Sequence, residues 1–175
     1  MTATNQKFDP ELLLTLSRLF TYPKEKPGLD DLKIVFGDEK LNNDKIADFS
    51  KPEGLTSLQT EYVRLFINAL PEVTCPPYGS FYLEGLLMGQ STVELNKVYS
   101  DYGMLTDEMP DHIAVELEFL GLLSSLPADD AIDDDYIFLV NHLRSWTPDF
   151  FEQVEKNDES GFYRELTKFT KGVIL

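Results

Sequence analysis

Acidic side chains and one histidine gather within a short stretch of this sequence. They are Asp107, Glu108, Asp111, His112 and Glu116. Two carboxylates and an imidazole can bind a metal ion, which could then serve a hydrolase. Free carboxylates can instead pair with arginine guanidinium groups, whose planar fork matches the two carboxylate oxygens. A third interpretation is helix-start chemistry, because Pro110 suits a first helical position and the helix dipole stabilises acids there. Spacing alone favours this third interpretation.

Cys75 offers a second reactive combination, in which His112 or His142 would activate a cysteine nucleophile. Cys75 precedes two prolines in an acidic stretch that would raise the pKa of its thiol, so the sequence disfavours such a nucleophile. One cysteine and two histidines also fall short of a typical zinc or iron–sulfur ligand set. The common phosphate-, dinucleotide- and zinc-binding motifs are absent, as are the common nucleophile motifs. We therefore expect no catalytic residue, no metal and no cofactor.

The net charge of −16 is concentrated in one part of the chain. Residues 65–143 contain 14 acids and a single base, Lys97, and so carry −13 of the total. Such a field repels nucleic acid and anionic lipid, and it attracts cationic peptides or protein surfaces. The alternative is that the charge serves solubility alone.

Apolar residues recur at helical spacing through most of the chain, beginning after an N-cap and proline pair at Asp9-Pro10. Three prolines and a glycine make residues 70–80 a turn-rich loop. In the first half of the chain, the predicted helical segments are residues 10–22, 30–36, 44–49 and 55–66.

The second half of the chain carries clear helix boundaries. Ser91–Glu94 reads as a capping box for a helix that stops at Gly103. Met109-Pro110 predicts the start of the longest apolar helix, which should end at Leu126-Pro127. The acids of residues 129–135 suit the start of the next helix. That helix should contain residues 136–146. Another helix should start at Thr147-Pro148, and a last one should cover residues 161–175.

Length and composition indicate one folded domain that covers residues 1–175. A hydrophobic share of 42%, with 12 Phe and 8 Tyr, is enough for a sizeable core. Met1–Lys7 lacks an apolar stretch behind positive charges, and no run reaches the length of a membrane span. These features predict a cytoplasmic protein. The expected fold is an all-α, single-domain bundle of about eight to ten helices.

Several segments stand in a characteristic order along the chain. They are Glu61–Phe66, Pro76–Ser80, Gly103–Phe119, His142–Pro148 and Phe162-Tyr163. In this order they resemble the signature series of the TorD/DmsD/NarJ family, also called redox enzyme maturation proteins. The resemblance extends over about residues 55–170. Two departures leave the subfamily open: Ile67–Pro71 replaces a frequent Gly-Pro step, and Leu120 replaces a common methionine.

The resemblance implies an all-helical chaperone rather than an enzyme. Such a protein binds the N-terminal leader of a molybdopterin-containing oxidoreductase, often a twin-arginine pair followed by an apolar stretch. It holds the client until the cofactor is inserted and the enzyme can be assembled or exported. Carboxylates for the guanidinium groups and a hydrophobic groove for the apolar stretch would suit this ligand.

The resemblance and the charge together nominate a leader-binding set. It comprises Asp107, Glu108, Pro110, Asp111, His112, Glu116, Tyr62, Leu65, Phe66, Pro77, Tyr78 and Ser80. The expected arginine partners are Asp107, Glu108 and Asp111. Positions 62, 65 and 66 have core spacing and are expected to pack. His112, beside carboxylates, should be partly protonated near neutral pH, which predicts a pH-dependent grip on the leader.

Two other functions stay open from the sequence. One is an acidic all-helical adaptor for another protein client, and the other is a metal-dependent hydrolase that uses Asp107, Glu108, Asp111 and His112. The resemblance also implies guanine-nucleotide or molybdopterin-nucleotide binding, although no phosphate-binding motif is present. The expected partners are the leader and catalytic subunit of a molybdopterin oxidoreductase, with no nucleic acid and no membrane insertion. A monomer is expected, and the connection Leu126–Asp135 would allow a domain-swapped dimer.

Overall fold

The computed structural model describes residues 7–43, 45–68 and 72–175, so predictions that fall on residues 1–6, 44 and 69–71 lie outside it. Within these ranges every regular element is helical, apart from one isolated bridge between Tyr78 and His112. The all-α class is therefore confirmed. The α-helices are α1 (Pro10–Phe20), α2 (Leu29–Asn43), α3 (Pro52–Tyr62), α4 (Gly79–Glu84), α5 (Gln90–Asp101), α6 (Ile113–Ser125), α7 (Asp130–Asn157) and α8 (Phe162–Ile174). A 3-10 helix (Lys45–Ser50) and a π-helical turn (Val63–Ile67) flank α3.

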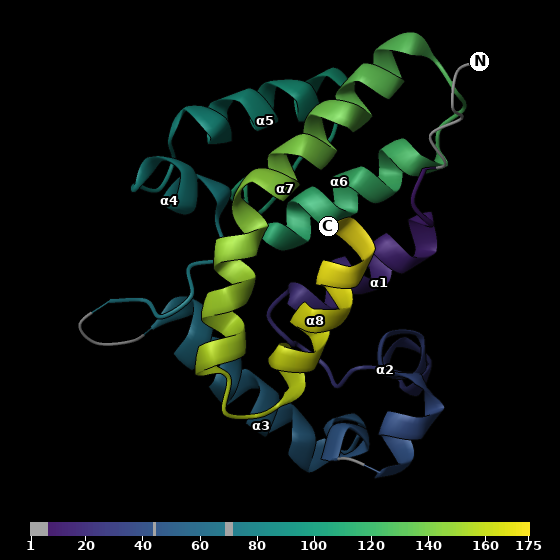
Figure 1. The fold of residues 1–175 in the computed structure, drawn as a ribbon, viewed down its shortest axis with the longest axis vertical. Coiled ribbons are helices and arrows are strands. Elements are labelled where there is room, and N and C mark those ends of the chain that lie inside the picture. The colour runs from purple at the N-terminus through teal and green to yellow at the C-terminus, as the bar shows by residue number, and fades with distance from the viewer. Residues whose placement is uncertain (1–6, 44, 69–71) are drawn as a thin grey trace.

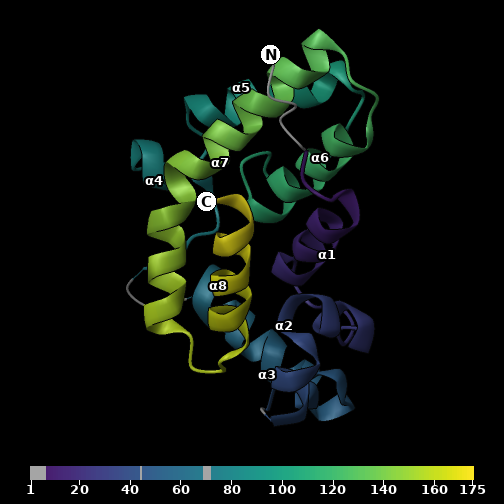
Figure 2. The ribbon, with the colours of Figure 1, turned by 45° about the vertical axis from the view of Figure 1, so that its right-hand side comes forward.

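Helices α6 and α7 form the centre of the fold, with the other helices packed around them (Figure 1). α1 lies along α6, and α8 returns antiparallel to the second half of α7. α4 packs on the middle of α7 and on α5, at one end of the molecule. α2, α3 and the 3-10 helix gather at the other end (Figures 1 and 2).

The packing of α1 on α6 positions one side of the site described below. The N-cap prediction is confirmed, because the Asp9 carboxylate accepts a hydrogen bond from the Glu11 amide at 3.0 Å. A Cβ built at Gly121 would approach Leu14 Cγ and the Pro10 carbonyl oxygen to 3.4 Å. Glycine at this position therefore lets the two helices lie close together.

An aromatic cluster joins the end of α3 to α7 and α8. The Phe66 ring lies 4.9 Å from Tyr62, 5.2 Å from Tyr163 and 6.1 Å from Phe150, between ring centroids. The pairs with Tyr62 and Tyr163 are edge-to-face, and such pairs add about 0.5–1.5 kcal/mol each beyond the burial of their area. Leu65 is fully buried beside them, so the expectation that positions 62, 65 and 66 pack in the core is confirmed.

The predicted start of α6 at Pro110 is wrong by three residues. The helix begins at Ile113, and His112 is its N-cap, with Nδ1 accepting a hydrogen bond from the Ala114 amide at 3.1 Å. A proline marks a permitted helix start, but histidine provides the cap acceptor here. The predicted end at Leu126-Pro127 is confirmed, because the last residue of α6 is Ser125 and Leu126 is its C-cap.

The predicted capping box of α5 does not form. The carboxylate of Glu84, which precedes the helix, accepts hydrogen bonds from the amides of Gln90 and Ser91 and from the Ser91 hydroxyl. The cap therefore comes from the last residue of α4 rather than from α5 itself. Gly103 has a φ of 67°, consistent with the predicted stop after this helix.

α7 is one helix of 28 residues, so the predicted break at Thr147-Pro148 is wrong. Pro148 lies inside the helix and cannot donate to the carbonyl of Arg144. The helix changes direction near its middle, which lets its two halves pack on different partners (Figure 1). None of the helices in the described ranges is long and apolar enough to cross a membrane.

Candidate functional site

A short ladder of hydrogen bonds fixes the segment before α4 to the start of α6. The Gly79 amide donates to the Asp111 carbonyl, and the Ile113 amide donates to the Pro77 carbonyl, both at 2.9 Å. The Asp111 carboxylate is fully buried and accepts a hydrogen bond from the Ser80 amide at 2.9 Å. Asp111 thus anchors this segment and is not exposed to a ligand.

Three polar side chains of α6 and α7 are buried together beneath the ladder. Glu116 lies 2.8 Å from His142 Nδ1 and accepts a hydrogen bond from Trp146 Nε1 at 3.1 Å. Burial raises the pKa of Glu116 to about 7. Burial alone would lower the pKa of His142, but the Glu116 carboxylate outweighs it and raises that pKa. This buried group ties α6 to α7.

His112, the N-cap of α6, is buried, with 3% of its surface exposed. Burial lowers the pKa of His112 to about 4, against the opposite effect of the Glu108 and Asp111 carboxylates. The prediction that His112 is partly protonated near neutral pH is therefore wrong. Its nearness to acids in the sequence could not reveal that the imidazole is removed from water.

A pocket of about 690 Å³ opens beside this junction. Its aromatic residues come from the end of α1, the end of α3 with its π-helical turn, and the segment before α4. Its carboxylates come from the loop before α6 and from α6 itself. The lining consists of Ser17, Thr21, Tyr22, Lys24, Tyr62, Phe66, Ile67, Pro77, Tyr78, Leu105, Thr106, Asp107, Glu108, His112, Ala114, Val115 and Glu118.

Three exposed carboxylates line this pocket. They are Asp107, Glu108 and Glu118. Glu108 is held in place because its Oε1 accepts hydrogen bonds from the Met109 amide at 2.9 Å and from the Tyr78 hydroxyl at 3.3 Å. None of the ion pairs between described residues engages these carboxylates. Lys24 is the single cation of the lining, so the pocket is acidic and open to a cationic ligand.

The structure brings seven of the predicted residues to the pocket. These are Tyr62, Phe66, Pro77, Tyr78, Asp107, Glu108 and His112. Leu65, Ser80, Asp111 and Glu116 are fully buried outside its lining, and Pro110 is half-buried outside it. The expected arginine partners were Asp107, Glu108 and Asp111. Asp111 is buried, and the third carboxylate accessible to an arginine is Glu118 instead.

Glu118, Tyr22 and Leu105 line the pocket although the sequence did not single them out as site residues. The sequence carried one signal for Glu118: it is a charged residue one helical turn beyond Ala114 in a helix that is otherwise mostly apolar. Leu105 is 96% exposed, which no periodicity argument could predict for a leucine in a loop.

The geometry gives no support to the metal and cysteine alternatives. The residues that the structure describes contain no group of three or more His, Cys, Asp or Glu placed to hold a metal ion. Cys75 is fully buried, and burial raises the pKa of its thiol to about 12. The predicted rise in this pKa is confirmed, with burial rather than acidic neighbours as its main cause.

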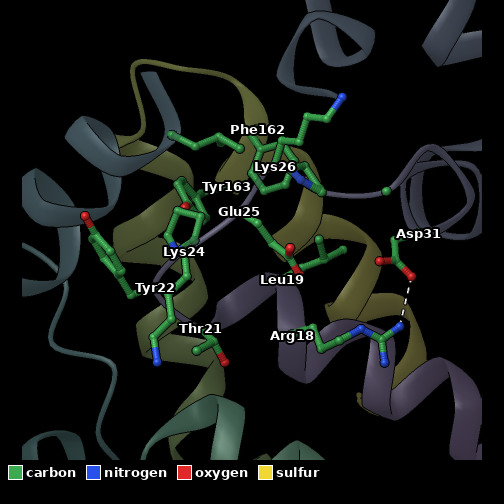
Figure 3. A pocket seen from close by; sticks show the side chains of 14 residues that line it. Arg18, Leu19, Thr21, Tyr22, Lys24, Glu25, Lys26, Asp31, Phe162 and Tyr163 are labelled. Atoms are coloured by element: carbon green, nitrogen blue, oxygen red, sulfur yellow. Dashed lines mark hydrogen bonds and ion pairs between the residues drawn. The ribbon is translucent and has the colours of Figure 1, made fainter. Parts of the chain in front are cut away.

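A second pocket, of about 330 Å³, adjoins the first, because Tyr22 and Lys24 line both (Figure 3). Arg18 and Lys26 add two further cations, and Arg18 pairs with Asp31 at 2.9 Å. The two neighbouring pockets therefore differ in charge, and only the larger one suits a cationic ligand.

The fold is all-helical, and it carries an acidic, aromatic-lined pocket beside the start of α6. A family model described as the nitrate reductase delta subunit matches residues 37–152. The chain belongs to this family, the NarJ/TorD group that the sequence motifs resemble.

Known proteins agree with this assignment. The chaperone TorD of Vibrio parahaemolyticus is 32% identical over 157 residues, which cover 82% of this chain and 68% of TorD. A Haemophilus influenzae protein described as the Tat proofreading chaperone DmsD is 30% identical, covering 89% of this chain and 76% of its own. A crystal structure described as a redox enzyme maturation protein from Archaeoglobus fulgidus superposes with a TM-score of 0.62 at 33% identity, covering 97% of this chain and 99% of that one. This chain spans between 49% and 76% of the length of the matched chaperones.

Proposed function

We propose that this protein is a system-specific chaperone that acts in the cytoplasm on a molybdopterin-containing oxidoreductase. It binds the N-terminal leader of the client and holds it until the cofactor is inserted and the enzyme can be assembled or exported. The single observation that carries the proposal is the open acidic pocket at the start of α6. The names of the relatives, TorD and a Tat proofreading chaperone, support it.

The pocket suits an arginine pair in both charge and shape. A guanidinium group can bind a carboxylate in two-pronged geometry, and Asp107, Glu108 and Glu118 are available for this contact. The flat face of a guanidinium also stacks on aromatic rings, which Tyr22 and Tyr78 provide in the same lining. Lysine would keep the charge but lose the fork and much of the stacking.

The charge of the whole middle region supports a cationic partner. Residues 65–143 carry −13, and this field would raise the rate at which a basic leader encounters the pocket. Exposed charge pairs are screened by salt, with a Debye length of about 8 Å at physiological ionic strength. Binding through these carboxylates is therefore expected to weaken as salt is added.

The test is calorimetric titration of the purified protein with leader peptides from the molybdoenzymes of its own genome. Each peptide is measured at two salt concentrations and as a version in which lysine replaces the arginine pair. Binding of one leader with a Kd near or below about 1 μM, weakened by salt and by lysine, is the expected result. Absence of binding to every leader would contradict the proposal as stated and direct the search to the folded body of a client.

A further inference from the structure

The first residue of α4 lies directly on the buried polar group of α6 and α7. A Cβ built at Gly79 would approach His142 Cε1 to 3.0 Å and Trp146 Nε1 to 3.1 Å, which is tighter than side chains normally pack. Glycine at this position therefore lets the backbone of α4 rest on the two rings. Tyr78, the N-cap of α4, lines the acidic pocket. The placement of His142 and Trp146 thus fixes one wall of that pocket.

Glu116 of α6 holds both rings in place. Its carboxylate lies 2.8 Å from His142 Nδ1 and accepts a hydrogen bond from the Trp146 indole N–H at 3.1 Å. The Glu116 side chain is fully buried, and the His142 side chain is 8% exposed. Net charge is costly in such surroundings, so the pair is most stable as carboxylate with imidazolium or as carboxylic acid with neutral imidazole. In both forms the two side chains share one titrating proton.

Acidic groups face His142 from α4, α5 and α6. Glu116 belongs to α6, Asp111 to the segment before α6 and Glu94 to α5. Glu84, the last residue of α4, is also within range of the charge on His142. His142 Nε2 and Asp111 Oδ1 are buried without a hydrogen-bond partner among the residues that the structure describes. Loss of the shared proton would therefore leave the Glu116 and Asp111 carboxylates buried together without a counter-charge.

We propose that Glu116 and His142 are positioning residues for leader binding, and that their shared proton holds one wall of the acidic pocket in place. With the proton bound, the pair keeps Gly79 seated on the rings and Tyr78 in the pocket. When the proton leaves to solvent, the buried carboxylate draws in water, the start of α4 loosens and Tyr78 no longer lies against the leader. The pair itself does not line the pocket, so it acts through Tyr78. This inference rests on the proposed function and adds regulation by pH to it.

The direction of the pH dependence follows from the pKa values of the pair. Burial raises the pKa of Glu116 to about 7. Burial lowers the pKa of His142, but the Glu116 carboxylate outweighs it and raises this pKa above its ordinary value. A group whose pKa is raised in the folded state stabilises the fold below its unfolded pKa and loses this effect as the pH rises through the folded value. The wall should therefore be firm at about pH 6 and loosen as the pH rises past about 7.

Three other buried groups do not titrate in this range. Burial lowers the pKa of His112 to about 4 and raises that of Cys75 to about 12. Tyr99, which faces Glu116 from α5, has a pKa that burial raises well above its usual range. A change of leader affinity between about pH 6 and 9 therefore points to the Glu116–His142 pair.

The experiment measures the affinity of the full chain for a leader peptide between about pH 6 and 9 at constant ionic strength. The probe is an acetylated synthetic peptide with an arginine pair followed by a leucine-rich run, without histidine, cysteine or acidic residues, so that its own charge stays constant. Hydrogen exchange of the Gly79 and Ser80 amides, which donate to Asp111, is followed in the free protein and corrected for the intrinsic effect of pH on exchange.

We expect the wild-type protein to bind this peptide about three- to tenfold more tightly at about pH 6 than at about pH 9, with a parallel loss of amide protection. Glu116→Gln cannot lose a proton, and its amide still accepts from the Trp146 N–H and donates to His142. Its affinity should stay near the wild-type value at low pH across the whole range. The matched control Glu152→Gln, which changes an exposed acid of α7 outside the acidic pocket, should follow wild type.

His142→Gln provides a second variant in case Glu116→Gln does not fold, and melting curves accompany each protein. Burial raises the pKa of Glu116 and His142 opposes this rise, so without the imidazole the affinity should fall at a higher pH than in wild type. This shift is a response of the pair itself, which a general weakening of the fold would not produce.

An affinity that stayed constant or rose with pH in the wild type would overturn the inference, as would a wild-type profile in Glu116→Gln. A melting temperature that changed with pH while the affinity did not would show that the pair serves stability alone, which also overturns it. If the wild-type protein bound no peptide at any pH, the proposed function itself would fail, and that result is distinct from the others.

Discussion

Asp107 and Glu118 are the residues best placed to recognise a cation without serving the fold. Both are exposed, and neither pairs with a described cation. Replacing them together by Asn and Gln should weaken binding of an arginine leader by about 1–2 kcal/mol, since exposed pairs contribute about 0.2–1 kcal/mol each and the pocket partly shields them. The melting temperature should stay within error of wild type. Asp101→Asn, an exposed acid outside the pockets, is the control in the same calorimetric assay.

His112 is expected to make the stability of the fold depend on pH, because its imidazole is buried in the neutral form. The unfolded chain takes up a proton near pH 6.5, whereas the folded chain takes it up only near pH 4. Between these values the unfolded state binds more protons, so stability falls as the pH is lowered from 6.5 to 4. This group alone accounts for roughly 3 kcal/mol of that fall, at about 1.4 kcal/mol per pKa unit.

Urea denaturation of His112→Asn, measured across this pH range, checks this effect. Asparagine keeps an acceptor at the N-cap, so the variant should fold and show a shallower loss of stability than wild type. Because His112 stays neutral between about pH 5.5 and 8, the change of leader affinity with pH in this range should be the same in the wild type and in the variant. A steep change in affinity with the wild type, absent from the variant, would show that the histidine titrates in that range after all.

Between elements, Asp111 joins the start of α4 to the start of α6 through the Ser80 amide. Asp111→Ala would leave that buried amide without its acceptor, which costs about 1–3 kcal/mol. We expect a lower free energy of unfolding in urea and a weaker hold on any leader, because Pro77 and Tyr78 would no longer be fixed beside the pocket. Asp107→Ala is the matched control, and equal stability of the two variants would contradict the structural role of Asp111.

Phe66 connects α3 with α7 and α8 in the aromatic cluster. Phe66→Ala should lower the free energy of unfolding by about 3–5 kcal/mol, the usual range for a buried phenylalanine. Phe66→Leu keeps most of the volume and should cost much less. A stable Phe66→Ala that lost leader binding would mean that the ring acts mainly as a pocket wall.

Helix faces were predictable from the sequence, while the boundaries set by distant contacts were not. The apolar spacing after Pro10 and after Gly161 predicts α1 and α8, because one buried stripe is a local property. Pro148 looks the same in sequence whether it starts a helix or bends one. Asp111 and Asp107 likewise look alike until a segment 31 residues away places the Ser80 amide against one of them.

At the scale of the whole molecule, the concentration of negative charge in residues 65–143 should act on the kinetics of binding. Long-range attraction raises the association rate and is screened by salt, while short-range contacts set the dissociation rate. We therefore expect added salt to slow association of an arginine leader more than it speeds dissociation. Stopped-flow measurements at several ionic strengths check this, with a neutral serine-substituted peptide as the reference. An association rate that did not change with salt would contradict it.

Trp146 is the one tryptophan of the sequence, and it lies fully buried with its ring stacked on Tyr82 and its indole N–H bound to Glu116. A tryptophan in such surroundings emits at short wavelength and shifts to longer wavelength when water reaches it. Its fluorescence therefore reports whether the junction of α4, α6 and α7 is intact. Trp146 does not line the acidic pocket, so we expect a bound leader to leave this signal unchanged. A tryptophan placed in the peptide would report binding of the leader. The two fluorescence signals, measured in one sample, distinguish an unfolded protein from one that is folded but has no leader bound.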